Sequence, residues 1–200
     1  MTRPIKSISD FKGQLVGGGA RPNLIAVQLA NIPGSAHWQG DTATAFTYLC
    51  KAAQLPASTI ANVDVPFRGR IFKVAGDRTI ENWSITVIND EDFKIRNAFE
   101  EWMQLIARLE NNLGATNPSS YMADADVYQL GRGGKAGDRS NSSAGEVSAV
   151  LKQYKMLGMF PVSLGAIDLS YDTGDTIEEF TVEFALQSFN PVGQSGERTA

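Results

Sequence analysis

The sequence contains one cysteine and one histidine among its 200 residues, and this scarcity excludes several kinds of chemistry. Because Cys50 has no second cysteine to pair with, no disulfide can form within the chain, which fits folding in a reducing, cytoplasmic compartment. Cys50 lies in an apolar run and is expected to be a small core residue. Histidine-based zinc ligation and Ser-His or Cys-His catalysis would all require His37, an expected loop residue without an evident partner.

Long apolar segments are also missing. The first eleven residues mix Arg3, Lys6 and Asp10 with isolated apolar residues, so they lack the continuous apolar core of a signal peptide. No stretch of 18 apolar residues occurs anywhere in the sequence. We therefore expect no membrane insertion.

The glycine-rich and acidic motifs do not match known binding sites. The run Gly131–Lys135 lacks the glycine of a phosphate-binding loop, where Gln129 stands, and the following Ser or Thr, where Ala136 stands. Three acidic residues near the C-terminus do not match the spacing of a calcium-binding helix-loop-helix: Asp172, Asp175 and Glu178. We expect no cofactor, no metal and no catalytic residues.

Positive charge is nearly absent from the C-terminal fifth of the chain. Residues 161–200 carry seven acidic residues and one basic residue, Arg198, which gives this part a net charge of −6. Residues 1–160 have a net charge of +2, so the whole chain has a net charge of −4. Affinity for phosphates comes mainly from Lys and Arg, so this region is not expected to grip nucleic acid. The simplest interpretation is a solvated face of a strand.

Alternating apolar residues indicate a mainly β fold. Strands are predicted over Leu24–Ala30, Ile80–Ile88, Ala125–Leu130, Glu146–Leu157 and Thr176–Phe189. The apolar run Ala45–Ala52 is interpreted as a further strand. Two more are predicted at Val63–Val65 and Phe67–Ala75, with a break at Pro66 and a turn at Gly76–Asp77.

A helical period replaces the alternation over Asn89–Leu113. Its apolar residues recur at steps of three and four: Ile95, Phe99, Trp102, Ile106, Leu109 and Leu113. Asn89 or Asp90 could cap the helix, and Gly114 is a natural stop. The segments suggest an N-terminal arm (1–22), one domain (23–189) with a flexible loop (131–145), and a C-terminal tail (190–200).

Several short motifs occur in a characteristic order. They are Ala20–Leu24 (ARPNL), Cys50–Ala52 with Leu55-Pro56, Val65–Arg70 (VPFRGR), Ala75–Thr79 (AGDRT) with Trp83, Val87–Glu91 (VINDE), Phe160-Pro161, Asp168–Asp172 (DLSYD) and Ile177–Val182 (IEEFTV). In order and spacing, residues 20–189 resemble the major tail tube proteins of contractile-tailed bacteriophages, a superfamily shared with type VI secretion tubes. The loop at 131–145 is longer than that family leads us to expect.

The resemblance implies a structural protein of the virion, assembled in the host cytoplasm. It implies two packed antiparallel sheets forming a β-sandwich or barrel (α+β), a flanking helix and extended arms. It also implies hexameric rings that stack with themselves into a tube inside a tail sheath. Tape-measure, baseplate and tail terminator proteins would be further partners, and DNA would pass through the channel without specific binding.

Two sets of charged residues are candidates for roles in such a tube. Candidates for the subunit interface, which could equally form salt bridges beside the core, are Arg68, Arg70, Asp77 and Arg78. Candidates for lining the channel are Glu178, Glu179 and Glu183. The N-terminal arm has too few apolar residues to form a core, so we expect it to act between subunits.

The residues alone leave two alternative functions open. The chain could be a tube subunit of a type VI secretion system or an extracellular contractile injection particle. Less favoured is a ligand-binding β-barrel protein, which would remain monomeric where a tube subunit forms rings.

Overall fold

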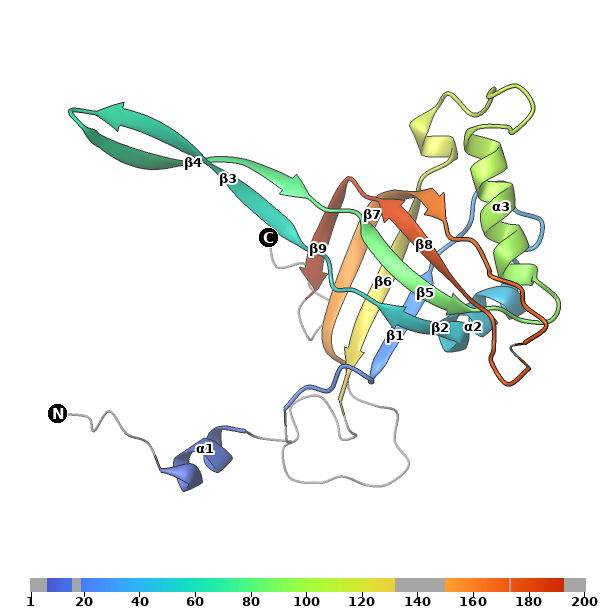
Figure 1. The fold of residues 1–200 in the computed structure, drawn as a ribbon, viewed down its shortest axis with the longest axis horizontal. Helices are drawn as coiled ribbons and strands as arrows, with labels where there is room; N and C mark the ends of the chain where they lie inside the picture. Colours follow the sequence, from blue (N-terminus) through green and yellow to red (C-terminus); the bar gives the residue numbers. More distant parts are fainter. Residues whose placement is uncertain (1–6, 16–18, 132–149, 173, 193–200) are drawn as a thin grey trace.

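Antiparallel strands make up most of the chain (Figure 1), and the computed structural model describes residues 7–15, 19–131, 150–172 and 174–192. The helices are α1 (Ile8–Gln14), α2 (Gly40–Leu49) and α3 (Lys94–Ile106), with a short 3-10 helix at Pro118–Ser120. The strands are β1 (Ile25–Leu29), β2 (Cys50–Ala53), β3 (Ser58–Phe67), β4 (Arg70–Ile80), β5 (Trp83–Ile88), β6 (Ala123–Leu130), β7 (Val150–Leu164), β8 (Glu179–Ala185) and β9 (Ser188–Val192). The prediction of a mainly β protein is confirmed.

Seven strands form one large sheet in the order β1-β6-β7-β8-β5-β2, with β9 added beside β7. The long strand β7 joins its two halves, because its first part pairs with β6 and β9 and its last part pairs with β8. The strands at the two ends of this order, β1 and β2, contact each other. The large sheet therefore curls around the core, while β3 and β4 form a separate two-stranded sheet.

The inner face of β5 and β8 is built from the alternating residues that the sequence indicated. Ile85 pairs with Val182 and Val87 with Phe180, and all four side chains are buried. The expected single strand Thr176–Phe189 is in fact two strands, since the chain bends after β8 and β9 turns back along β7. Residues 190–192, expected in the C-terminal tail, belong to β9.

Helix α3 covers the core with the first half of its predicted apolar stripe. Ile95, Phe99 and Trp102 are fully buried, and the Phe99 ring lies 5.9 Å from the ring of Phe184 on β8. The prediction is wrong for the last two residues of the stripe. The helix ends at Ile106, and Leu109 and Leu113 are 89% and 67% exposed.

The ends of α3 also differ from the expectation. Neither Asn89 nor Asp90 caps the helix, because the chain first turns at Asp90–Phe93 and Phe93 takes a left-handed conformation with φ 54°. At the other end the chain folds back, and the Ala115 N–H donates to the Leu105 carbonyl. Gly114 belongs to this returning segment, where a Cβ atom would lie 1.9 Å from the Ile106 carbonyl oxygen.

Helix α2 replaces most of the strand expected over Ala45–Ala52. Thr42 and Phe46, one helical turn apart, are buried, and the Phe46 ring lies 6.1 Å from Phe99. Threonine and aromatic residues favour strands locally, so the helix depends on this tertiary packing. Only Cys50–Ala53 forms a strand, β2.

Candidate assembly surfaces

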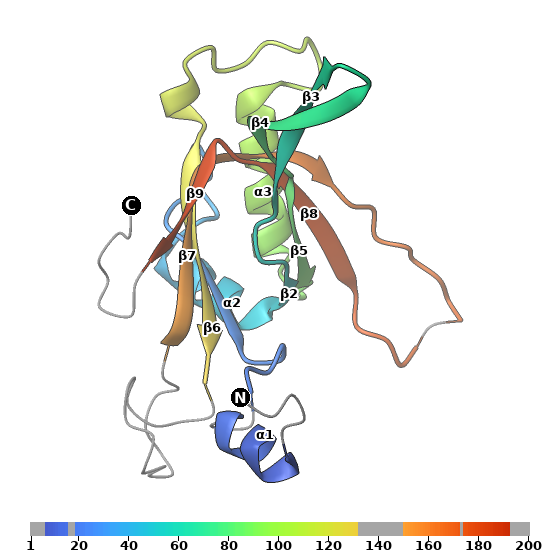
Figure 2. The ribbon, with the colours of Figure 1, turned by 90° about the vertical axis from the view of Figure 1, so that its left-hand side faces the viewer.

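A long hairpin of β3 and β4 projects away from the body of the protein (Figures 1 and 2). All ten residues of β3 are exposed along its whole length. The predicted break at Pro66 and turn at Gly76–Asp77 are wrong, because β3 runs through Pro66 and both Gly76 and Asp77 lie within β4. Gly76 instead marks a register shift opposite Ala61, where glycine permits a close approach of the two strands.

The hairpin turns at Arg68 and Gly69, between the paired residues Phe67 and Arg70. Their φ angles of 46° and 82° are both positive, as a type I′ turn requires. Glycine adopts such angles freely, but arginine does not. The Arg68 guanidinium lies over the Phe67 ring, 5.3 Å from its centroid.

One face of the hairpin is apolar and nothing in the described chain covers it. Cross-strand partners share a face, and two such pairs, Val63 with Val74 and Val65 with Phe72, lie on the side of Phe67. Their exposed fractions run from 43% at Val74 to 66% at Phe72. The other face carries the ion pair of Asp64 and Lys73, whose atoms are 3.5 Å apart.

The four candidate interface residues all lie on this hairpin. Arg68 and Arg70 are at its tip, and Asp77 and Arg78 follow the register shift near its base. Their side chains are exposed, so none of them flanks the core.

The three candidate channel residues lie at the start of β8 and along it. Glu179 and Glu183 occupy the face opposite the buried Phe180, Val182 and Phe184. Glu179 forms an ion pair with Lys51 of β2, and Glu183 accepts a hydrogen bond of 2.9 Å from Asn82. Glu178 precedes the strand and accepts from the Asn89 amide at 3.0 Å.

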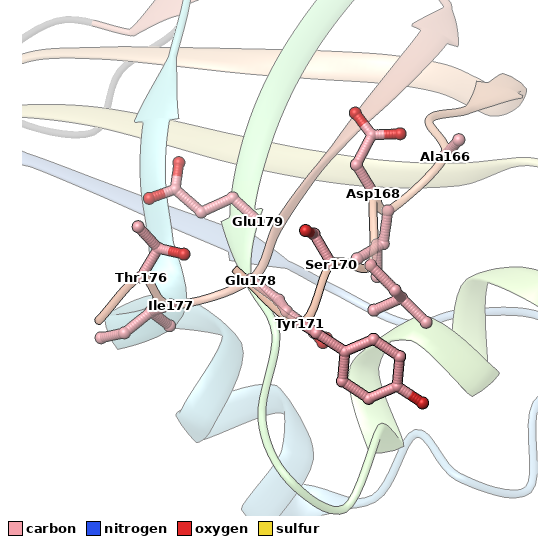
Figure 3. A pocket seen from close by; sticks show the side chains of 10 residues that line it. Ala166, Asp168, Ser170, Tyr171, Thr176, Ile177, Glu178 and Glu179 are labelled. Atoms are coloured by element: carbon pink, nitrogen blue, oxygen red, sulfur yellow. The ribbon is translucent and has the colours of Figure 1, made fainter. Parts of the chain in front are cut away.

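A hollow that sequence reasoning did not find lies beside these carboxylates (Figure 3). It measures about 600 Å³ and is formed by the segment between β7 and β8, from Ala166 to Tyr171 and from Thr176 to Glu179. Apolar residues and carboxylates line it together. Among the sequence motifs, DLSYD and IEEF supply these residues, but only the folded loop brings them together.

His37 has a partner that sequence reasoning missed. Its Nδ1 atom lies 2.8 Å from Glu101 Oε1, and the Ser35 hydroxyl donates to the other carboxylate oxygen at 2.6 Å. Burial alone would raise the pKa of Glu101, but these hydrogen bonds outweigh it and lower the pKa below its ordinary value. Ser35 and His37 belong to the loop before α2 and Glu101 belongs to α3, so these hydrogen bonds attach the loop to the helix.

Cys50 is buried as expected, and burial raises the pKa of its thiol to about 12. A thiol with so high a pKa is a poor nucleophile at neutral pH. Within the described ranges, no group of three or more His, Cys, Asp or Glu side chains could hold a metal ion. No helix of those ranges has both the length and the apolar character that crossing a bilayer demands.

Part of the expected arm is helical. Helix α1 begins with a capping box, in which the Ser7 hydroxyl accepts from the Asp10 N–H and the Asp10 carboxylate accepts from the Ser7 N–H. Ile8, Phe11 and Leu15 are all exposed. The loop at 131–145 falls almost entirely outside the described residues.

Comparison with known proteins identifies the family. Residues 20–191 match the family model described as phage tail tube protein. The chain is 32% identical over 170 residues to tail tube protein gp19 of Enterobacteria phage T4, covering 85% of this chain and 90% of that protein. The chain is 31% identical to tail tube protein gp19 of Enterobacteria phage T6, again over 85% of this chain and 90% of that protein.

A solved structure shares the fold at much lower identity. It is the sheath–tube complex of an extracellular contractile injection system, PVC, in its extended state, with a TM-score of 0.53 and 13% identity. The match covers 90% of this chain and 95% of the other. The match to the family model over most of its length shows that this chain belongs to the phage tail tube protein family.

Proposed function

We propose that this tail tube protein assembles into six-membered rings that stack into a tube, through which DNA leaves the virion. The exposed apolar face of the β3–β4 hairpin carries this proposal. A two-stranded hairpin that packs on nothing is marginally stable at best in water. The contiguous apolar side chains along its length therefore need a covering surface, and copies of the same chain supply it.

The outer face of β8 suits the wall of such a channel. Glu179, Thr181 and Glu183 lie on it, beside Ser84 and Thr86 of the neighbouring strand β5, and Glu179 also pairs with Lys51 of β2, the strand beyond β5. A wall that is polar and poor in positive charge attracts little DNA, because few phosphate counterions are released on contact. The tail sheath, tape-measure, terminator and baseplate proteins are the further partners of this role. The role is structural and requires no catalysis.

Electron microscopy of the purified protein tests the proposal directly. Wild-type protein is expected to form rings and tubes, whereas a population of isolated monomers under all assembly conditions would contradict it. Replacing Val65 and Phe72 by Thr keeps the strand preference of both positions and removes the apolar contact. We expect this variant to unfold within about 0.5 kcal/mol of the wild type, as exposed substitutions do, but to form few tubes.

A matched control removes two exposed leucines from another part of the molecule. Leu109→Thr with Leu113→Thr deletes a similar amount of exposed apolar surface on the segment after α3. Tube formation by this control should equal that of the wild type. Equal loss in both variants would mean that general surface polarity, and not the hairpin face, governs assembly.

The second candidate is the tube of another contractile injection machine. The shared fold with the tube of the extracellular injection system favours it. Double-stranded DNA inside the assembled particles would favour the phage tail, and particles that carry protein cargo would favour the alternative.

A further inference from the structure

The long strand β7 contains a bulge where it passes from one half of the large sheet to the other (Figures 1 and 2). Two residues of β7, Leu157 and Gly158, oppose a single residue of β6, Asp124, because the pairing shifts there by one position. The pairs on either side of this shift are Ala125 with Met156 and Ala123 with Met159. A bulge of this kind bends its strand and increases the local twist.

The bulge decides which side chains of β7 enter the core. Side chains of a regular strand alternate between its two faces, so residues 156 and 159, three positions apart, would point to opposite faces. Met156 and Met159 are nevertheless both fully buried in the same apolar cluster. The extra residue therefore resets the alternation, and both parts of β7 turn their apolar side chains toward one core.

The partners of β7 change at the same level of the sheet. Strand β9 pairs with β7 as far as Leu157, and β8 replaces it as the partner from Phe160 onward. One half of the sheet, with β1, β6 and β9, thus meets the other half, with β8, β5 and β2, at the bulge. Because both halves share β7, the bend at the bulge sets the angle between them.

Gly158 has the backbone conformation that this bend uses. Its φ of 60° lies in the left-handed region, which glycine enters at little cost. A Cβ atom at this position would lie 3.0 Å from Gln187 Cγ, so a side chain would also meet a neighbour. The extra residue of a bulge stands outside the ladder of the strand pair, and its N–H needs another acceptor.

Asp124 supplies that acceptor. Its Oδ1 atom accepts a hydrogen bond of 3.1 Å from the Gly158 N–H, and its Oδ2 atom lies 3.7 Å from Lys155 Nζ. A carboxylate is a stronger acceptor for a backbone N–H than a neutral group. The backbone carbonyl of Asp124 accepts from the Ala30 N–H at 3.1 Å, which attaches the residue to the end of β1 as well.

We infer that Asp124 is a positioning residue for tube assembly: by holding the Gly158 N–H, it fixes the angle between the two halves of the large sheet and so the curvature of the ring. Bulges set the curvature of sheets in general. A ring of identical copies closes only when each copy is turned by the same angle from the last, so a subunit with an altered bend gives open or irregular rings. This inference rests on the proposed function and adds a residue that acts through the shape of the subunit.

Two substitutions separate the place of the acceptor from its charge. Asp124→Asn keeps an oxygen at the place of Oδ1 and loses the negative charge, so its tubes should have the wild-type diameter and yield. Asp124→Glu keeps the charge, but its longer side chain moves the oxygens away from the Gly158 N–H. We expect rings of variable diameter and a loss of most regular tubes in electron micrographs of this variant. Asp124→Ala removes the acceptor altogether and should have the same effect.

Hydrogen exchange in the unassembled protein measures the bulge itself. The Gly158 amide should exchange about tenfold faster in Asp124→Glu than in the wild type, as the loss of one hydrogen bond predicts, and at the wild-type rate in Asp124→Asn. Asp126→Ala is the matched control. Asp126 lies on the same face of β6 and accepts from the Gln153 side chain at 3.1 Å instead of from the bulge, so this variant should exchange and assemble normally.

The outcomes distinguish this inference from the proposed function. Regular tubes of wild-type diameter from both Asp124→Glu and Asp124→Ala would overturn the inference. Normal tubes from Asp124→Glu with failed assembly of Asp124→Asn would also overturn it, because the charge pair with Lys155 would then be the feature that matters. If Asp124→Ala does not fold, the comparison of Asp124→Asn with Asp124→Glu decides. In all these cases tubes of the wild type leave the proposed function standing, whereas a monomeric wild type would contradict both.

Discussion

Trp102 joins the predicted stripe of α3 to the aromatic core. Its ring lies 5.9 Å from that of Phe184 and 6.5 Å from that of Phe99, and its side chain is fully buried. Its Nε1–H donates a hydrogen bond of 2.6 Å to the Tyr121 carbonyl. The residue therefore contributes both apolar contact and a satisfied polar group, and Tyr121 fixes the chain just before β6.

Replacing Trp102 by Ala should lower the free energy of unfolding by roughly 3–5 kcal/mol, the usual cost of emptying a buried aromatic site. Leu109→Ala is the control, because that leucine is 89% exposed and its loss should cost less than about 0.5 kcal/mol. Chemical denaturation of unassembled protein measures both. A loss below about 1 kcal/mol for Trp102→Ala would show that its cavity refills or that its contribution is small.

At the scale of elements, the chain after α3 explains why that helix is short. The segment 107–115 folds back along the last helical turn, held by hydrogen bonds from Ala115 to Leu105 and from Arg108 to Leu113. The first of these bonds satisfies the Leu105 carbonyl, which the end of the helix otherwise leaves unpaired. Gly114 makes the return possible because only a residue without Cβ fits against the Ile106 carbonyl.

Gly114→Ala should destabilise the protein by roughly 1–3 kcal/mol, the range for forcing an extra methyl group into a packed site. A Cβ placed 1.9 Å from the Ile106 oxygen must displace backbone, which cannot yield as a side chain can. Gly40→Ala, at the start of α2, is the matched control, since no atom lies within 4 Å of its added Cβ. Thermal unfolding compares the two, and equal melting temperatures would show that the returning segment moves freely.

At the scale of the whole molecule, charged residues separate onto different surfaces. Arginines gather on the projecting hairpin, while Glu179 and Glu183 lie on the outer face of β8. If the hairpin joins copies, the β8 face is left available for the channel. In the proposed tube, the same sheet would present an apolar side to its own core and a polar side to the channel.

Replacing Glu178, Glu179 and Glu183 by Lys should slow DNA ejection from the virion more than it reduces tube assembly. The three substitutions raise the net charge of each subunit by six, and the added lysines would attract DNA phosphates by counterion release. Because salt weakens this attraction, the delay in ejection should shrink as the salt concentration rises. The loss of the Lys51 pair is a minor cost, about 0–1 kcal/mol for a surface ion pair. Ejection at the wild-type rate and salt dependence would remove these residues from the channel wall.

A matched triple variant provides the control for net charge. Glu91, Glu100 and Glu110 are exposed acidic residues on and around α3, on other surfaces of the molecule. Their replacement by Lys changes the charge of the subunit equally. Ejection from these virions should keep its normal rate.

The sequence alone determined the inward faces of β5, β8 and the first half of α3. Trp83, Ile85 and Val87 alternate, and Ile95, Phe99 and Trp102 follow helical spacing, so local periodicity was enough to place them in the core. These features depend on residues close together in the chain.

Tertiary structure decided what local periodicity could not. A glycine followed by an aspartate is typical of a turn, yet strand pairing places Gly76 at a register shift within β4. The hairpin turns instead at Arg68-Gly69. Leu109 and Leu113 continue the helical spacing, but the returning segment ends α3 at Ile106. The hollow at Asp168–Tyr171 and Ile177–Glu179 exists only once the loop folds, because its walls come from residues that no short sequence pattern relates.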